Sequence, residues 1–163
     1  MTCNPVVIIG YGNPSRGDDA LGPEFLRHLE NTREQGVLPP IFDTITDFQL
    51  QIEHAVDLQQ RQLVLFVDAS VSATPPFEFH ELTPRRDESY SSHAMTPAAV
   101  LEVFTQFNDS PPPPAFLLTI PGKNFELGTK LSQESESYLK SALEHTVTLL
   151  RSPNATIWRG LCS

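Results

Sequence analysis

The sequence predicts an α/β protein, a three-layer α/β/α sandwich around a five-stranded, mostly parallel mixed sheet with one antiparallel strand. Short apolar runs typical of strands alternate along the chain with stretches whose apolar residues recur at helical spacing. One connection between strands is too short to hold a crossover helix, which predicts the antiparallel member. The 163 residues contain no internal repeat and no linker that divides them, so residues 1–163 are expected to form a single domain.

The first strand is expected at Val6 to Ile9, where adjacent β-branched residues suit a buried central position. A helix follows, with Gly22 as its cap and Pro23 at its first position, where the missing N–H costs nothing. Gly36 suits the exit from this helix. Its buried stripe is expected to consist of Phe25, Leu26 and Leu29.

A second strand is expected near residues 41–46 and a second helix over residues 49–58. Apolar residues of this helix that are candidates for the core are Leu50, Ile52, Ala55, Val56 and Leu58.

The apolar run from Leu63 to Val67 is the strongest buried-strand signal in the chain, and it ends abruptly at Asp68. The fourth strand, residues 77–82, is expected to run antiparallel to the third, because residues 69–76 cannot hold a helical crossover. Its imperfect alternation of apolar and polar residues is typical of an edge strand.

The third helix is expected to begin at Thr96, as N-cap, with Pro97 next, and to lead to a last strand at residues 116–120. A fourth helix over residues 132–151 follows, and the tail beyond it has no clear pattern.

Composition excludes several classes of function. With 11 basic and 20 acidic residues the formal net charge is −9, which argues against a nucleic-acid binder and against adsorption to anionic membranes. No apolar run approaches the roughly 20 residues of a transmembrane helix. The two cysteines, Cys3 and Cys162, make neither a disulfide framework nor a zinc motif. We expect a cytoplasmic, monomeric protein without nucleic-acid or membrane partners.

Acidic residues follow two of the predicted central strands. Asp18 and Asp19 lie in the loop after the first strand, and Asp68 follows the third. In open α/β sheets, ligands bind beyond the carboxyl ends of the strands. The third helix must start at the same edge, so we expect His93, just before it, to lie there as well.

Asp19, Asp68 and His93 together would offer carboxylate oxygens and an imidazole nitrogen, a set that suits Zn, Ni, Fe or Mn better than Ca. A purely structural interpretation is equally open at this point. Asp18 and Asp19 would then stabilise the start of the first helix, Asp68 would cap a turn, and His93 would be an ordinary loop residue.

Other sites at this edge are disfavoured. The Gly10-x-Gly12 pair resembles the start of a dinucleotide-binding loop, but Ser15 replaces its third glycine, and two carboxylates at the helix mouth would repel a pyrophosphate. The chain has neither a P-loop lysine motif nor the GxSxG motif of a serine hydrolase.

Residues 10–22 read Gly-Tyr-Gly-Asn-Pro-Ser-Arg-Gly-Asp-Asp-Ala-Leu-Gly, which resembles the G-x-G-N-x4-D-[DE]-x-x-G motif of the hydrogenase maturation endopeptidases. Phe66 to Ala69 resembles the family's second motif, an aspartate that ends an apolar strand. Ser92-His93 before a helix resembles the third. The resemblance covers essentially the whole chain and implies the α/β/α sandwich already predicted.

The resemblance implies an endopeptidase that removes the C-terminal extension from the precursor of a [NiFe]-hydrogenase large subunit after nickel insertion. Asp19, Asp68 and His93 match the residues that recognise the metal and serve catalysis. The nickel is expected to be carried by the substrate, with another divalent transition metal able to take its place. Asp19 stands where the family often has glutamate, one methylene longer.

Three more residues are expected to contact substrate. Asp47 and Gln49 lie in the loop after the second strand, where the family usually has a D-G-G-T sequence linked to substrate recognition. Asp18 is a further candidate, also as a group that activates water. Two other functions stay open: a non-proteolytic metal-binding maturation factor, and a general metal-dependent peptidase or amidase on the same fold.

Overall fold

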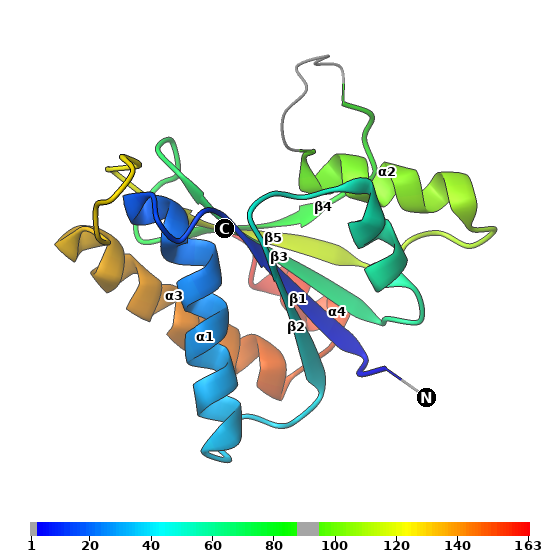
Figure 1. Ribbon diagram of the computed structural model, residues 1–163. Coiled ribbons are helices and arrows are strands. Elements are labelled where there is room, and N and C mark those ends of the chain that lie inside the picture. The colour runs from blue at the N-terminus through cyan, green and yellow to red at the C-terminus, as the bar shows by residue number, and fades with distance from the viewer. Residues whose placement is uncertain (1–2, 88–94) are drawn as a thin grey trace.

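The computed structural model describes residues 3–87 and 95–163 (Figure 1). One sheet has the strand order β2-β1-β3-β5-β4. Its strands are β1 (Val6–Tyr11), β2 (Phe42–Asp47), β3 (Leu63–Ser70), β4 (Glu78–Leu82) and β5 (Ala115–Pro121).

Strands β1, β2, β3 and β5 are parallel, and β4 is antiparallel to β5. The predicted mixed sheet with one antiparallel edge strand is therefore confirmed. Strand β4 pairs with β5 rather than with β3, because β5 returns between them after its crossover helix. We call the end of the sheet where the parallel strands finish the carboxyl edge, and the opposite end the amino edge.

Three long helices lie within about two residues of the predicted ones. They are α1 (Leu21–Glu34), α2 (Pro97–Phe107) and α3 (Gln133–Arg151). The start of α1 is corrected: its N-cap is Ala20, so Gly22 and Pro23 lie in its first turn rather than at the predicted cap and first position. The Thr96 hydroxyl accepts the Ala99 N–H at 3.1 Å, which confirms the predicted N-cap of α2. The structure adds two short elements, η1 (Gly17–Ala20) and α4 (Ala155–Gly160), and has the 3-10 helix η2 (Ile52–Leu58) in place of the helix predicted over residues 49–58.

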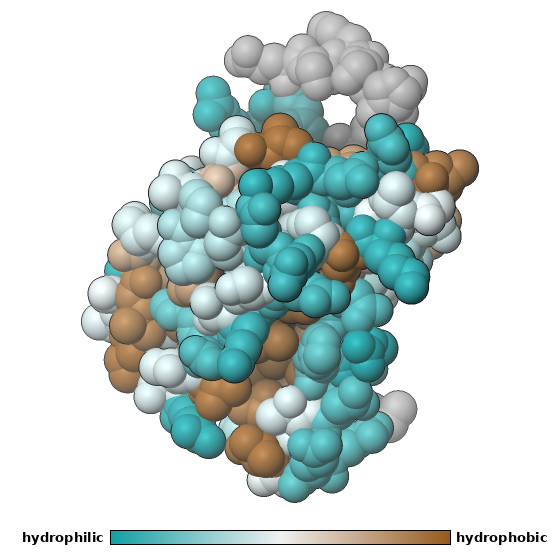
Figure 2. Space-filling view, turned by 90° about the vertical axis from the view of Figure 1, so that its left-hand side faces the viewer, coloured by the Kyte–Doolittle hydropathy of each residue, from teal (hydrophilic) through white to brown (hydrophobic). Residues whose placement is uncertain are grey.

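The central strands β1 and β3 are largely apolar on both faces because each face of the sheet is covered by helices (Figure 1). One face packs against α1, α3 and α4, and its core includes Ile8, Phe25, Leu65 and Trp158. On that side of the molecule, hydrophilic side chains cover much of the surface, with smaller apolar areas between them (Figure 2).

The other face packs against η2 and α2. Residues that alternate with those of the first core, including Ile9 and Phe66, contact apolar side chains of these two helices. Tyr11, the last residue of β1, belongs to this second core. By the same alternation, Asp68 lies on this face of β3, since Phe66 faces it and Val67 faces the first core.

The prediction for residues 49–58 is corrected in two respects. The segment forms a short 3-10 helix from Ile52 to Leu58. Of its candidate core residues, Ile52 is 59% exposed and Val56 is 64% exposed, whereas Leu50, Ala55 and Leu58 are buried as predicted. The tighter period of a 3-10 helix narrows the stripe that can face the sheet, so these two side chains are left outside.

The tail is ordered by one aromatic side chain. Trp158 is fully buried in the first core, and its indole N–H donates to the backbone oxygens of Leu149 (2.9 Å) and Ser152 (3.0 Å). The Ser163 backbone N–H donates to Phe79 O at 2.9 Å, so the end of the chain pairs with the exposed edge of β4. Within the described ranges, no helix has the length and apolar character needed to span a bilayer.

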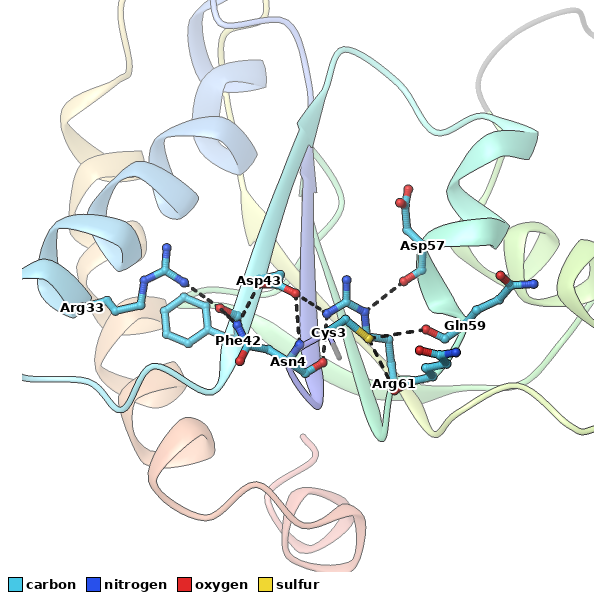
Figure 3. Close-up of polar contacts among 9 residues, drawn as sticks. Cys3, Asn4, Arg33, Phe42, Asp43, Asp57, Gln59 and Arg61 are labelled. Carbon is cyan, nitrogen blue, oxygen red and sulfur yellow. Dashed lines mark hydrogen bonds and ion pairs between the residues drawn. The ribbon is translucent and has the colours of Figure 1, made fainter. Parts of the chain in front are cut away.

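A polar cluster closes the amino edge, at the end of the sheet opposite the predicted site (Figure 3). The Arg61 guanidinium donates to the backbone oxygens of Asn4 (2.9 Å) and Asp57 (3.1 Å) and forms an ion pair with Asp43. The Asn4 amide also donates to Asp43, at 2.7 Å. These contacts tie the start of β1 and β2 to the turn before β3, far from the residues expected to bind a ligand.

A buried histidine predicts a pH-dependent stability. His145 packs between Phe77 and Phe79, its buried Nε2 has no hydrogen-bond partner among the described residues, and burial lowers the pKa of its imidazole. An unfolded histidine titrates near pH 6.5, so below that pH the unfolded state binds more protons and the free energy of unfolding falls.

In urea denaturation at pH 7.5 and 5, His145→Phe should lose less stability in acid than wild type. His80→Gln, which changes a half-exposed histidine on β4 outside this aromatic contact, is the comparison variant. Equal acid losses in wild type and His145→Phe would contradict the assignment.

Candidate functional site

Polar side chains gather at the carboxyl edge, where β1, β2 and β3 end. Tyr11 and Asp47 are register partners at the last positions of β1 and β2. Asp68 follows Val67, which pairs with Gly10 on the neighbouring strand. The loop from β1 to α1 returns over this edge and carries Asp19.

Close backbone packing places Asp19. Gly12 has a φ of +145°, and a Cβ added there would lie 2.0 Å from the backbone oxygen of Asp19, so only glycine fits. The Asn13 backbone N–H donates to Asp19 Oδ2 at 2.7 Å. This hydrogen bond fixes the carboxylate above the end of β1, and Oδ1 has no hydrogen-bond partner within residues 3–87 and 95–163.

Asp68 lies in a much less polar setting. The pKa of its carboxyl is raised to about 6: burial is the largest cause and the nearby charge of Asp19 adds to it, whereas hydrogen bonds from the Ala69 N–H and the Tyr11 hydroxyl act in the opposite direction. The Ala69 N–H donates to Asp68 Oδ1 at 2.8 Å. The fold thus brings two of the three predicted site residues, Asp19 and Asp68, close enough for their charges to interact.

Tyr11 is a member of this site that the sequence analysis missed. Its side chain is buried, and its pKa is raised well above the usual value, first by that burial and then by the negative charge of Asp68. Its hydroxyl interacts with the Asp68 carboxylate. The sequence did contain a signal for Tyr11: it lies between Gly10 and Gly12 at the end of a central strand, a place where a large side chain with a polar group can reach a site at the carboxyl edge.

His93, the third predicted residue, lies outside the described residues. The segments on both sides of residues 88–94 are held together, because the Asp87 carboxylate accepts the backbone N–H (3.2 Å) and the hydroxyl (2.7 Å) of Thr96. Thr96 also caps α2, which begins at Pro97. The position of His93 relative to Asp19 and Asp68 therefore stays a prediction.

Asp18 has a structural role, which corrects the substrate-contacting and water-activating roles predicted for it. Its completely buried carboxylate accepts the backbone N–H groups of Lys123 (2.7 Å), Asn124 (3.1 Å) and Ser132 (2.8 Å) and the Ser132 hydroxyl (3.0 Å). Burial alone would raise the pKa of Asp18, but these donors outweigh it and lower the pKa. Neither carboxylate oxygen is left to face a substrate or water.

The loop after β2 presents the other two predicted residues differently. Asp47 is partly exposed, and its carboxylate accepts the Phe48 N–H at 2.7 Å and lies 3.4 Å from Nε2 of His54. Gln49 is exposed, next to Phe48, whose side chain is 65% exposed. Both residues are accessible at the carboxyl edge, as contact with a substrate requires, and that role stays a prediction.

The two carboxylates at this edge could serve as oxygen ligands of a divalent cation. Asp19 and Asp68 supply carboxylate oxygens, and each has one oxygen held by a backbone N–H, which fixes the direction of the other. Among the described residues, no three histidine, cysteine or acidic side chains form a group that could hold a metal by themselves. By themselves, the two carboxylates would supply only part of a metal's ligand set.

Solved structures with the same architecture include hydrogenase maturation proteases. One is the [NiFe] hydrogenase maturation protease HycI from Thermococcus kodakarensis, with 21% identity and a TM-score of 0.68 over 91% of this chain and 94% of that one. Another is the hydrogenase maturating endopeptidase HybD from E. coli, with 21% identity and a TM-score of 0.69 over 94% of both chains. A hydrogenase 2 maturation peptidase from a Thaumarchaeota archaeon has 21% identity and a TM-score of 0.63, covering 89% and 97%.

At this level of identity the likeness shows the fold, and it confirms the fold that the motif resemblance implied. No family model and no curated protein matches the chain by sequence.

The desolvated Asp68 carboxylate predicts a stabilising mutation. Because the folded state raises the pKa of Asp68 to about 6, ionisation opposes folding, and stability is lost as pH rises from about 4 through 6. Asp68→Asn should therefore raise the free energy of unfolding at pH 7 by up to about 3 kcal/mol, and the gain should vanish near pH 4. Denaturant titrations at both pH values measure it.

Asp18→Asn is the matched control with the opposite sign. The four donors around Asp18 favour its charged form, so this variant should lose stability at pH 7. An Asp68→Asn protein that is no more stable than wild type at pH 7 would contradict the assigned environment.

Proposed function

We propose that this protein is an endopeptidase that removes the C-terminal extension of a [NiFe]-hydrogenase large-subunit precursor after nickel insertion, acting as a cytoplasmic monomer. The observation that carries the proposal is the meeting of Asp19 and Asp68 at the carboxyl edge. Their loops have the motif spacing of this protease family, and the solved proteins with this fold include endopeptidases that mature hydrogenases.

In this proposal the nickel belongs to the substrate. Asp19 and Asp68 supply oxygen ligands, and neutral His93 supplies a nitrogen ligand, so that the metal held by the precursor completes its coordination sphere on this protein. The positive charge of the metal would polarise the scissile carbonyl or activate the water that attacks it. Water adds across the C–N bond, giving a carboxylate on the mature subunit and an amine on the released peptide.

The two carboxylates have different tasks within this ligand set. Asp19 lies on a loop that close backbone contacts hold in place, so it offers a fixed ligand. Asp68 is desolvated and interacts with Tyr11, and a carboxylate in such surroundings gains more from binding a cation than a solvated one does. Substrate bearing nickel is thereby favoured over substrate without it.

Single alanine variants test the ligand set. Asp19→Ala, Asp68→Ala and His93→Ala should each lower the rate of precursor cleavage by at least about 100-fold, because each removes one ligand. The assay follows the mass of a nickel-loaded precursor. Glu144→Ala, which changes an exposed carboxylate on α3, should cleave at the wild-type rate.

The outcomes separate the proposal from its alternatives. Full cleavage by all three ligand variants would eliminate the site. A wild-type protein that binds the precursor without changing its mass would be a non-proteolytic maturation factor. Cleavage of unrelated peptides, with or without nickel, would indicate a general peptidase.

Cleavage should also depend on pH. Metal binding requires ionised Asp68 and neutral His93, and the pKa of Asp68 is raised to about 6. The rate should therefore fall as pH drops through about 6, and a steady rate between pH 7.5 and 5 would contradict the requirement. Measuring kcat/KM over this range with nickel-loaded precursor gives the apparent pKa of the free enzyme. The Glu144→Ala control should show the same profile.

A further inference from the structure

An apolar groove lies between η2 and α2, outside the second core. Three large apolar side chains border it while remaining largely exposed: Ile52 (59%), Val56 (64%) and Phe107 (75%). The groove has a volume of about 190 Å³. Its lining residues are Ile52, Glu53, Ala55, Val56, Gln59, Phe104, Phe107 and Asn108.

The size of the groove indicates what it can accept. Pockets for small-molecule ligands usually have volumes of about 300–1,000 Å³, so this one is too small for a typical metabolite. It is open along the surface and apolar, which suits one or two large side chains from another polypeptide. Grouped apolar side chains that remain exposed mark interaction sites in soluble proteins.

The two segments that line the groove carry acidic side chains, and Glu53 is the one charged residue among the described residues of the lining itself. Arg85 approaches the opposite end of α2, where its backbone N–H donates to Ala98 O. Residues 47–59 and 97–109 contain no lysine or arginine, and their carboxylates are Asp47, Glu53, Asp57, Glu102 and Asp109. The next arginine after η2, Arg61, is paired with Asp43 at the amino edge. Within the described part of the chain, Glu53, Glu102 and Asp109 form no ion pair, so their charges are available to a basic partner.

The groove belongs to the same layer as the candidate site. Tyr11 and Asp68 face the η2 and α2 side of the sheet, and α2 begins just after the segment that carries His93. At the carboxyl edge, His54 of η2 lies beside Asp47, which is followed by the exposed Phe48. The groove is lined by Gln59, Phe107 and Asn108 at the far ends of η2 and α2, so a polypeptide bound at the site would have to run along this layer to occupy it.

We propose that the groove docks the polypeptide substrate, through a segment that inserts large apolar side chains and carries lysine or arginine beside them. This inference rests on the proposed function and adds a second contact region to it. The negative charge of the two segments that line the groove disfavours a second copy of this chain as the partner, because the same carboxylates would face each other across a dimer.

The test measures KM and kcat for cleavage of a nickel-loaded large-subunit precursor. Val56→Ser combined with Phe107→Ser should raise KM about tenfold and leave kcat unchanged, because it removes binding shared by the ground state and the transition state. Glu53→Gln combined with Glu102→Gln should weaken the salt dependence of KM, since fewer charges attract the precursor. Ile157→Ser is the matched control; Ile157 is 47% exposed on α4, over the other face of the sheet, and its variant should keep the wild-type KM.

All altered residues in the groove variants are surface residues, and thermal unfolding of each variant verifies the fold. A KM within twofold of wild type for the Val56/Phe107 variant would overturn the inference while leaving the proposed function intact. Precursor binding that depends on the groove, without any cleavage by wild type, would support docking and overturn the proposed function. No binding of precursor by wild type would overturn both, and a wild-type dimer that this variant dissolves would assign the groove to self-association.

Discussion

The carboxylate of Asp18 is the contact on which the site depends. It accepts four hydrogen bonds from the connection between β5 and α3, although it belongs to the loop between β1 and α1. This buried contact ties the two connections together above the carboxyl edge. Because Asp18 is held inside, the adjacent Asp19 is held in a loop that faces the end of β1. Two neighbouring aspartates thus have separate roles, one structural and one at the surface of the site.

The site itself works against folding. Asp68 follows five buried apolar residues within β3, so its carboxylate is desolvated, and Asp19 adds a like charge nearby. The Ala69 N–H and the Tyr11 hydroxyl offset only part of this penalty. Such an arrangement is typical of functional sites, where an unfavourable environment in the free protein becomes favourable once a ligand of opposite charge is bound.

The second layer of helices connects the site to the rest of the surface. η2 is a short 3-10 helix. Ala55 and Leu58 on it, and Leu50 just before it, are buried against the sheet, whereas Ile52 and Val56 remain exposed. Apolar side chains beside α2 therefore remain exposed, because the short η2 helix covers only part of this face of the sheet. Under the proposed function, a large polypeptide substrate would be bound by contacts beyond its reacting atoms, and this layer offers apolar contact and negative charge together.

Local patterns in the sequence determined much of this protein. Continuous apolar runs fixed the buried strands, Thr96 and Ser132 marked helix starts, and the residues 69–76 limited β4 to the antiparallel direction. The sequence also placed Asp19 and Asp68 at one edge, since both follow parallel strands. Tertiary structure alone decided that Asp18 turns inward, that Tyr11 joins Asp68, that β5 separates β3 from β4, and that Trp158 orders the tail. Those outcomes depend on contacts between residues far apart in the chain, such as Asp18 with Ser132, and local sequence carries no record of which distant donors or surfaces will be near.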